Sequence, residues 1–137
     1  YKYKAPVAEM GTAFSSSSST PESRAMALAK AKEIVASAPV VVFSKSYCPF
    51  CVQVKKLLMQ LGASFKAVEM DTESDGTEIQ SALAEWTGQR TVPNVFINGK
   101  HIGGCDDTIA LNKGGKLVAL LTEAGAISGS SKTTVTA

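Results

Sequence analysis

The 137-residue chain lacks the features of a nucleic-acid-binding, secreted or membrane-spanning protein. Its formal net charge is only +2, and no run of Lys and Arg interleaved with aromatic residues suggests a nucleic-acid partner. Its three cysteines are too few, and odd in number, for the disulfide framework of a secreted domain. No apolar stretch approaches the roughly 18 residues of a membrane span, and no signal-peptide core is present. We therefore expect a cytoplasmic protein.

Metal-ligating residues are also scarce in the sequence. His101 is the only histidine, and no Cys, Asp or Glu lies near it at a spacing typical of a metal site. A lone histidine of this kind is more often a surface residue than a ligand. We therefore expect no bound metal.

The composition is that of one globular domain with extended ends. Hydrophobic residues make up 45% of the chain and charged residues 19%, and the length suits one domain with a real core. Residues 1–19 lack apolar periodicity and include five consecutive serines, which predicts a flexible tail. Residues 128–137 are again polar and predict a second flexible tail. The expected domain is therefore 20–127.

The N-terminal tail carries two further hypotheses. If Met10 is the natural initiator, residues 1–9 are a remnant of an expression vector. Residues 10–15 would then fit the M-G-x-x-x-[ST] pattern for acylation of Gly11, which would attach the protein to a membrane. The alternative is a chance match in a serine-rich tail. The sequence leaves both possibilities open.

Hydrophobic periodicity and turn signals predict alternating helices and strands. In the first helix, Leu28, Ala31 and Val35 recur at helical spacing. We predict helices over 20–36, 49–61 and 75–86, one broken helix or two short ones over 106–124, and strands over 40–43, 65–70, 95–97 and 101–102.

Four of these segments are the strands of the predicted sheet. Residues 40–43 are all apolar and largely β-branched, which is typical of a central strand covered on both faces. The helix and strand that follow predict a parallel neighbour for it. Asn98-Gly99 between apolar runs predicts a tight hairpin, which adds an antiparallel pair.

A pair of cysteines lies at the predicted turn between the first strand and the second helix. Cys48 would sit where the helix begins, Pro49 at its first position, and Cys51 one turn further on the same side. A helix N-terminus stabilises a thiolate, which is the nucleophilic form of cysteine. The spacing therefore predicts a redox pair that can close a disulfide. The alternative is two structural cysteines.

Four motifs in this order resemble those of the dithiol glutaredoxins, particularly those of plants and green algae. They are FSKSYCPFC at 43–51, WTG at 86–88, TVP at 91–93 and GGCD at 103–106. The resemblance covers roughly 25–127 and implies an α/β thioredoxin fold, a four-stranded mixed sheet flanked by helices, here with an extra N-terminal helix. Phe50 departs from the pattern, because many relatives have tyrosine there.

The resemblance implies a glutathione-dependent thiol–disulfide oxidoreductase that removes glutathione from glutathionylated proteins and reduces some protein disulfides. Cys48 would be the nucleophile and Cys51 the resolving thiol, with glutathione as co-substrate and a monomer as the expected state. The alternative is a non-enzymatic carrier or sensor, in which Cys48 and glutathione from two subunits hold a [2Fe–2S] cluster. Pro49 argues against the cluster, since relatives that bind one tend to have Gly or Ser there.

The resemblance also implies a glutathione site. Its expected residues are Lys45, Tyr47, Gln80, Thr91, Val92, Pro93, Gly104, Cys105, Asp106 and Asp107. In this fold the bond between Val92 and Pro93 is cis, and the strand edge at Val92 can pair with an extended peptide. The backbone N–H groups of Cys105 and Asp106, at a helix start, suit the γ-glutamyl carboxylate.

Four of these residues have alternative roles. Lys45 would stabilise the thiolate and bind a glutathione carboxylate, or it is a solvated surface lysine. Asp106 or Asp107 would accept the ammonium group of glutathione, cap the helix, or do both. Cys105 is a packed thiol, a second glutathionylation site or a partner in an intermolecular disulfide.

Overall fold

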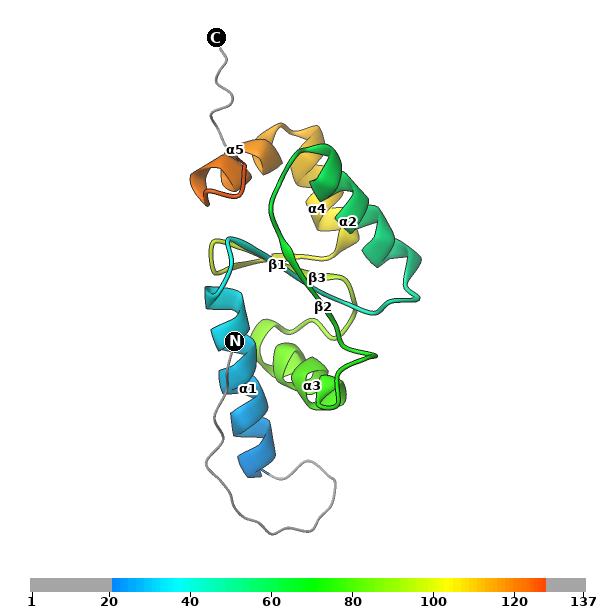
Figure 1. Cartoon of the computed structure of the whole chain (residues 1–137), viewed down its shortest axis with the longest axis vertical. Helices are drawn as coiled ribbons and strands as arrows, with labels where there is room; N and C mark the ends of the chain where they lie inside the picture. Colours follow the sequence, from blue (N-terminus) through cyan, green and yellow to red (C-terminus); the bar gives the residue numbers. More distant parts are fainter. Residues whose placement is uncertain (1–20, 128–137) are drawn as a thin grey trace.

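The computed structural model describes residues 21–127, which fold into a sheet covered by helices on both faces (Figure 1). The helices are α1 (Pro21–Ala36), α2 (Pro49–Gln60), α3 (Gly76–Thr87), α4 (Cys105–Lys113) and α5 (Lys116–Glu123). The strands are β1 (Val40–Ser44), β2 (Lys66–Glu69), β3 (Asn94–Ile97) and β4 (Lys100–Gly103). The expected tails and Gly11 lie outside the described residues.

The sheet confirms the predicted thioredoxin fold. Its strand order is β2-β1-β3-β4, with β1 parallel to β2 and antiparallel to β3, and β3 antiparallel to β4. The predicted hairpin turn joins β3 to β4, and both of its residues have a positive φ, 53° at Asn98 and 80° at Gly99. Asn and Gly are the residues that adopt this conformation most readily. The sheet is therefore mixed, as the sequence indicates.

Strand β1 is the centre of the core, and all five of its residues are buried. Val41 and Phe43 belong to the apolar cluster on the face covered by α1 and α3. Val40 and Val42 belong to the cluster on the opposite face, covered by α2, α4 and α5. This two-sided burial explains why the segment is apolar without alternation.

The buried face of α1 differs in part from the prediction. Ala31 and Val35 are buried as expected, but their buried partners on the helix are Ala27 and Ile34, while Leu28 is only half-buried. Helix α1 packs against α3, and Lys30 of α1 forms an ion pair with Asp75 at the start of α3, with 2.5 Å between Nζ and Oδ2. Helical spacing alone cannot reveal contacts of this range.

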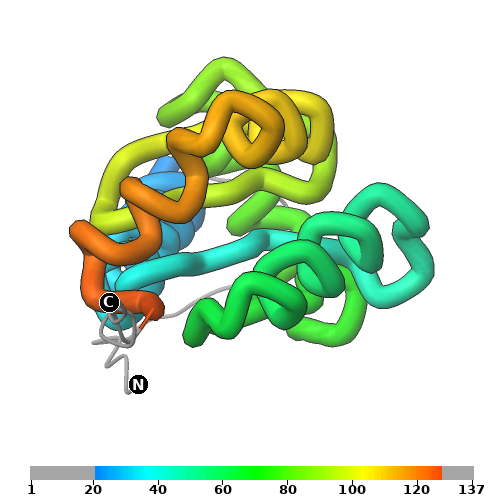
Figure 2. The backbone as a smooth tube through the Cα atoms, turned by 90° about the horizontal axis from the view of Figure 1, so that it is seen from above, coloured from blue at the N-terminus to red at the C-terminus, as the bar shows by residue number. Residues whose placement is uncertain are grey.

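Helices α2 and α4 lie next to each other over one face of the sheet (Figure 2). On α2, Val54 and Leu58 are fully buried in the cluster that contains Val40 and Val42. This packing holds the first turn of α2 beyond the carboxyl end of β1, where the two cysteines lie. None of the helices described for residues 21–127 is long and apolar enough to span a membrane.

Gly76, the first residue of α3, lies close against the backbone of Met70. A Cβ atom at this position would come within 1.8 Å of the Met70 carbonyl oxygen, which belongs to the backbone and cannot turn away. We predict that Gly76→Ala lowers the free energy of unfolding by about 2 to 3 kcal/mol, as overpacking does. Urea denaturation measures this loss.

Gly114→Ala is the matched control for this substitution. Gly114 has a φ of −83°, which any residue adopts, and its Cβ would find its nearest neighbour, the Ala110 carbonyl oxygen, at 3.6 Å. We expect this variant to stay within about 0.5 kcal/mol of the parent protein or to gain slightly. Equal losses in the two variants would contradict the steric explanation.

Candidate active site

Cys48 is the N-cap residue of α2, with Pro49 in the first turn as the sequence predicts. Its backbone N–H donates to the Lys45 carbonyl oxygen at 3.0 Å, which closes the turn after β1. Its sulfur accepts the backbone N–H of Cys51 at 3.3 Å. The Cys48 sulfur therefore takes the place of the usual capping oxygen, where backbone N–H groups and the helix dipole stabilise a negative charge.

Cys51 lies in a different environment from Cys48. It is fully buried, whereas Cys48 is 8% exposed at the surface of the site. Burial, reinforced by the hydrogen bond with Cys48, raises the pKa of the Cys51 thiol to about 11. At neutral pH Cys51 is therefore a thiol. The two cysteines are therefore unequal in their access to solvent.

A buried polar network lies beside Cys51. The Ser44 hydroxyl is fully buried at the end of β1 and donates to Glu69 Oε1 at 2.6 Å. Its interaction with the Cys51 thiol partly offsets the larger effect of burial on the pKa of that thiol. Lys55 Nζ binds the other oxygen of the same carboxylate at 2.6 Å. The network therefore links β1, β2 and α2 directly behind the cysteine pair.

The loop before Cys48 is anchored to the end of β2. Asp71 accepts hydrogen bonds from the Ser46 hydroxyl and, at 2.9 Å, from the Ser46 backbone N–H. These bonds hold the pKa of the Asp71 carboxyl below its usual range, with a smaller contribution from the charge of Lys45. The sequence does not reveal this role of Asp71, because nothing local connects it to residue 46.

Val92 faces Cys48 from the loop before β3. The Val92–Pro93 peptide bond is cis, as the resemblance implies. The Cys48 thiol points at the Val92 carbonyl oxygen, with 3.8 Å between sulfur and oxygen. A polypeptide edge is thus presented directly beside the sulfur.

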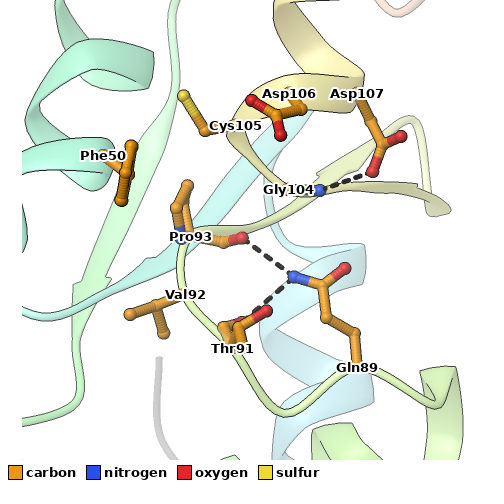
Figure 3. Close-up of a pocket in the computed structure, with 9 residues that line it drawn as sticks. All are labelled: Phe50, Gln89, Thr91, Val92, Pro93, Gly104, Cys105, Asp106 and Asp107. Atoms are coloured by element: carbon orange, nitrogen blue, oxygen red, sulfur yellow. Dashed lines mark hydrogen bonds between the residues drawn. The ribbon is translucent and has the colours of Figure 1, made fainter.

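A groove of about 430 Å³ opens along this edge (Figure 3). One wall comes from the loop before β3 and the other from the start of α4, and Phe50 of α2 also lines the groove. Its lining residues are Phe50, Gln89, Thr91, Val92, Pro93, Gly104, Cys105, Asp106 and Asp107. The structure therefore brings together seven of the residues predicted to bind glutathione.

The start of α4 distinguishes the two aspartates. Asp107 Oδ2 accepts the Gly104 backbone N–H at 3.1 Å and so caps the helix, while Asp106 is exposed at the groove. Gly103 allows this close arrangement, since its φ of +128° suits glycine and a Cβ there would lie 2.2 Å from Asp107 Oδ2. The capping role predicted for either residue thus falls to Asp107.

Cys105 is a packed thiol in the groove wall. It is 6% exposed, and its sulfur donates to Gln53 Oε1 of α2 at 3.3 Å. Burial raises the pKa of the Cys105 thiol, and the nearby carboxylate of Asp106 adds to the effect. Cys105 is therefore held as a thiol.

Three predicted residues lie outside the groove lining. Tyr47 is 71% exposed, and Lys45 is half-buried with its charge acting on Asp71. The Gln80 amide donates to the Arg90 carbonyl oxygen at 2.8 Å, which supports the loop that leads into the groove. A role for these three in binding glutathione stays a prediction.

Phe50 and Gln89 line the groove but are not among the residues predicted to bind glutathione. Phe50 is two residues from Cys48 and 57% exposed, which suits a groove wall. Gln89 carried no signal beyond its place just before Thr91. An amide with two N–H donors can bind neighbouring carbonyls, but the sequence does not reveal which way it turns.

Comparisons with known proteins agree with this architecture. A family model described as Glutaredoxin matches residues 40–102. Glutaredoxin-C6 of Oryza sativa subsp. japonica is 83% identical over 112 residues, which cover 82% of this chain and 100% of the rice protein. The crystal structure of wheat glutaredoxin shares 96% identity, with a TM-score of 0.73 over 74% of this chain and 96% of that one.

A buckwheat glutaredoxin solved in complex with glutathione is also similar. It shares 60% identity and a TM-score of 0.79, over 80% of this chain and 100% of its own. Identities of this size over nearly the whole described region establish common descent and common chemistry. The chain belongs to the glutaredoxin family and is a thiol–disulfide oxidoreductase.

Proposed function

We propose that the chain reduces glutathione mixed disulfides, with the Cys48 thiolate as nucleophile. The observation that carries the proposal is the position of the Cys48 sulfur, which accepts an N–H at the start of α2 and lies 3.8 Å from the Val92 carbonyl oxygen. The first contact stabilises a thiolate, and the second places an extended peptide beside it. The buckwheat complex supports glutathione as the co-substrate.

The main cycle uses one protein cysteine. The Cys48 thiolate attacks the glutathione sulfur of a glutathionylated protein, so that a bond forms between Cys48 and glutathione and the protein leaves as a thiolate. That thiolate takes a proton from solvent. A second glutathione thiolate then attacks the glutathione sulfur on Cys48, which regenerates the Cys48 thiolate and releases glutathione disulfide.

Cys51 extends the reaction to protein disulfides. Attack by Cys48 on such a disulfide gives a mixed disulfide with the substrate. Cys51 loses its proton and attacks the Cys48 sulfur, which releases the second substrate thiolate and leaves a Cys48–Cys51 disulfide. Two glutathione molecules then reduce this disulfide to the dithiol and are oxidised to glutathione disulfide.

The groove suggests how glutathione is held. The Val92 edge would pair with the cysteinyl part, which places its sulfur next to Cys48. The backbone N–H groups at the start of α4, from Cys105 and Asp106, would bind the γ-glutamyl carboxylate as an anion at a helix N-terminus. The exposed Asp106 carboxylate would accept the neighbouring ammonium group.

Replacing each cysteine separately tests this division of roles. We predict that Cys48→Ser lowers turnover of a glutathionylated peptide by at least about a thousandfold, since it removes the nucleophile. Cys51→Ser should keep that turnover and lose reduction of protein disulfides. Assays of both substrates with both variants measure this. Retained peptide turnover in Cys48→Ser, together with its loss in Cys51→Ser, would reverse the assignment.

The pKa of Cys51 predicts a pH dependence for disulfide closure. In the glutathionylated intermediate the charge on Cys48 is gone, but burial, the largest cause of the raised Cys51 pKa, remains. Below its pKa, the thiolate fraction of Cys51 rises about tenfold per pH unit, so the closure rate should rise alike between about pH 6 and 8.

Mixing reduced protein with glutathione disulfide and quenching with acid allows closure to be followed. Intact mass distinguishes the glutathionylated form from the intramolecular disulfide at each time. A closure rate that is constant over this pH range would contradict the assignment of a protonated Cys51.

A further inference from the structure

Gln89 has the best-connected side chain in the groove. It follows the end of α3 and is half-buried. Its Nε2 atom donates to the Thr91 carbonyl oxygen at 3.0 Å and to the Pro93 carbonyl oxygen at 2.9 Å (Figure 3). These two bonds use both N–H donors of the amide. The carbonyl groups on either side of Val92 are thus held by one side chain.

The Val92 carbonyl group, which lies between these two, points toward Cys48 instead. The Val92 oxygen faces the Cys48 sulfur at 3.8 Å. The three consecutive carbonyl groups of the loop are therefore divided, two bound to Gln89 and one beside the nucleophile. Gln89 therefore ties together the peptide groups that flank Val92.

Gln89 is itself fixed at its backbone. Its N–H donates to the Thr87 hydroxyl oxygen at 3.0 Å, and its carbonyl oxygen accepts from Asn94 Nδ2 at 3.4 Å. Asn94 is 1% exposed, and the Thr87 hydroxyl in turn donates to the Leu83 carbonyl oxygen of α3. The side chain of Gln89 thus extends from a point held by α3 and β3.

We propose that Gln89 is a positioning residue for glutathione. By binding the Thr91 and Pro93 carbonyls, it holds the Val92 edge in the orientation that pairs with the cysteinyl part of the tripeptide. It acts on the reaction only through that edge. The inference rests on the proposed function, since it assumes that glutathione lies along Val92.

Two substitutions remove the amide donors in different ways. Gln89→Leu keeps much of the side-chain volume, and Gln89→Glu keeps its shape but turns a carboxylate toward two carbonyl oxygens. We expect kcat/KM for a glutathionylated peptide to fall about tenfold in the leucine variant, as two lost hydrogen bonds predict, and further in the glutamate variant. The fall should lie mainly in KM.

The reactivity of Cys48 is a second measurement, because a general structural defect would change it and a positioning role would not. The contact between the Cys51 N–H and the Cys48 sulfur lies within α2 and does not involve the loop. Alkylation of Cys48 by iodoacetamide should therefore stay within about twofold of the parent rate. Parallel loss of alkylation and peptide turnover would overturn the proposal, and so would unchanged turnover.

Comparing the activity losses of the two variants distinguishes a positioning role of Gln89 from direct contact with glutathione. If Gln89 instead bound the ammonium group of glutathione through Oε1, the glutamate would keep an acceptor and add an attractive charge. It would then lose less activity than leucine. A smaller loss for Gln89→Glu than for Gln89→Leu would therefore overturn the positioning role.

Gln60→Glu controls for the change of charge. Gln60 is exposed at the last residue of α2 and lies outside the groove lining, so its substitution should leave both rates unchanged. Measurements on the parent protein distinguish a failure of the proposed function from a failure of the role of Gln89. If it reacts with iodoacetamide at Cys48 but does not turn over the glutathionylated peptide, the proposed function fails. If it turns over the peptide and Gln89→Leu does so equally well, only the role of Gln89 fails.

Discussion

The hydrogen bond from the Cys51 N–H to the Cys48 sulfur joins the chemistry of the site to the packing of the fold. It exists because α2 begins directly after Cys48, so that the first turn presents its N–H groups to that sulfur. The helix holds this position because Val54 and Leu58 are buried against the sheet. A shift of α2 along the sheet would therefore move the Cys48 sulfur away from the Val92 carbonyl oxygen.

Much of the fold could be predicted because its signals are local. The unbroken apolar run in β1 and the turn at Asn98 and Gly99 each fix one element through neighbouring residues alone. Helical spacing places Leu28 with Ala31 and Val35, but in the fold, where α1 packs against α3, Leu28 is only half-buried. An ion pair joins Lys30 of α1 to Asp75, 45 positions apart, and no periodicity encodes it. Contacts of this range depend on the whole fold.

The features of the site that depend on neighbouring residues could be predicted from the sequence, and those that depend on the fold or on side-chain direction could not. The position of Cys48 at a helix start follows from spacing. Its contact with Val92 was expected only from family resemblance, because the folded sheet brings the two residues together. The sequence left the capping role open between Asp106 and Asp107, which are adjacent and chemically identical. The choice depends on side-chain direction, and so does the role of Gln89, whose amide could equally face solvent.

The central claim, that glutathione bound to Cys48 lies along the Val92 edge and ends at α4, is tested most directly by a crystal structure. The suitable form is the Cys51→Ser variant glutathionylated on Cys48, in which closure cannot occur. The account predicts hydrogen bonds between the cysteinyl backbone and Val92, and a γ-glutamyl carboxylate bound to the N–H groups of Cys105 and Asp106. A glutathione that leaves Val92 unpaired and lies across Tyr47 instead would contradict it.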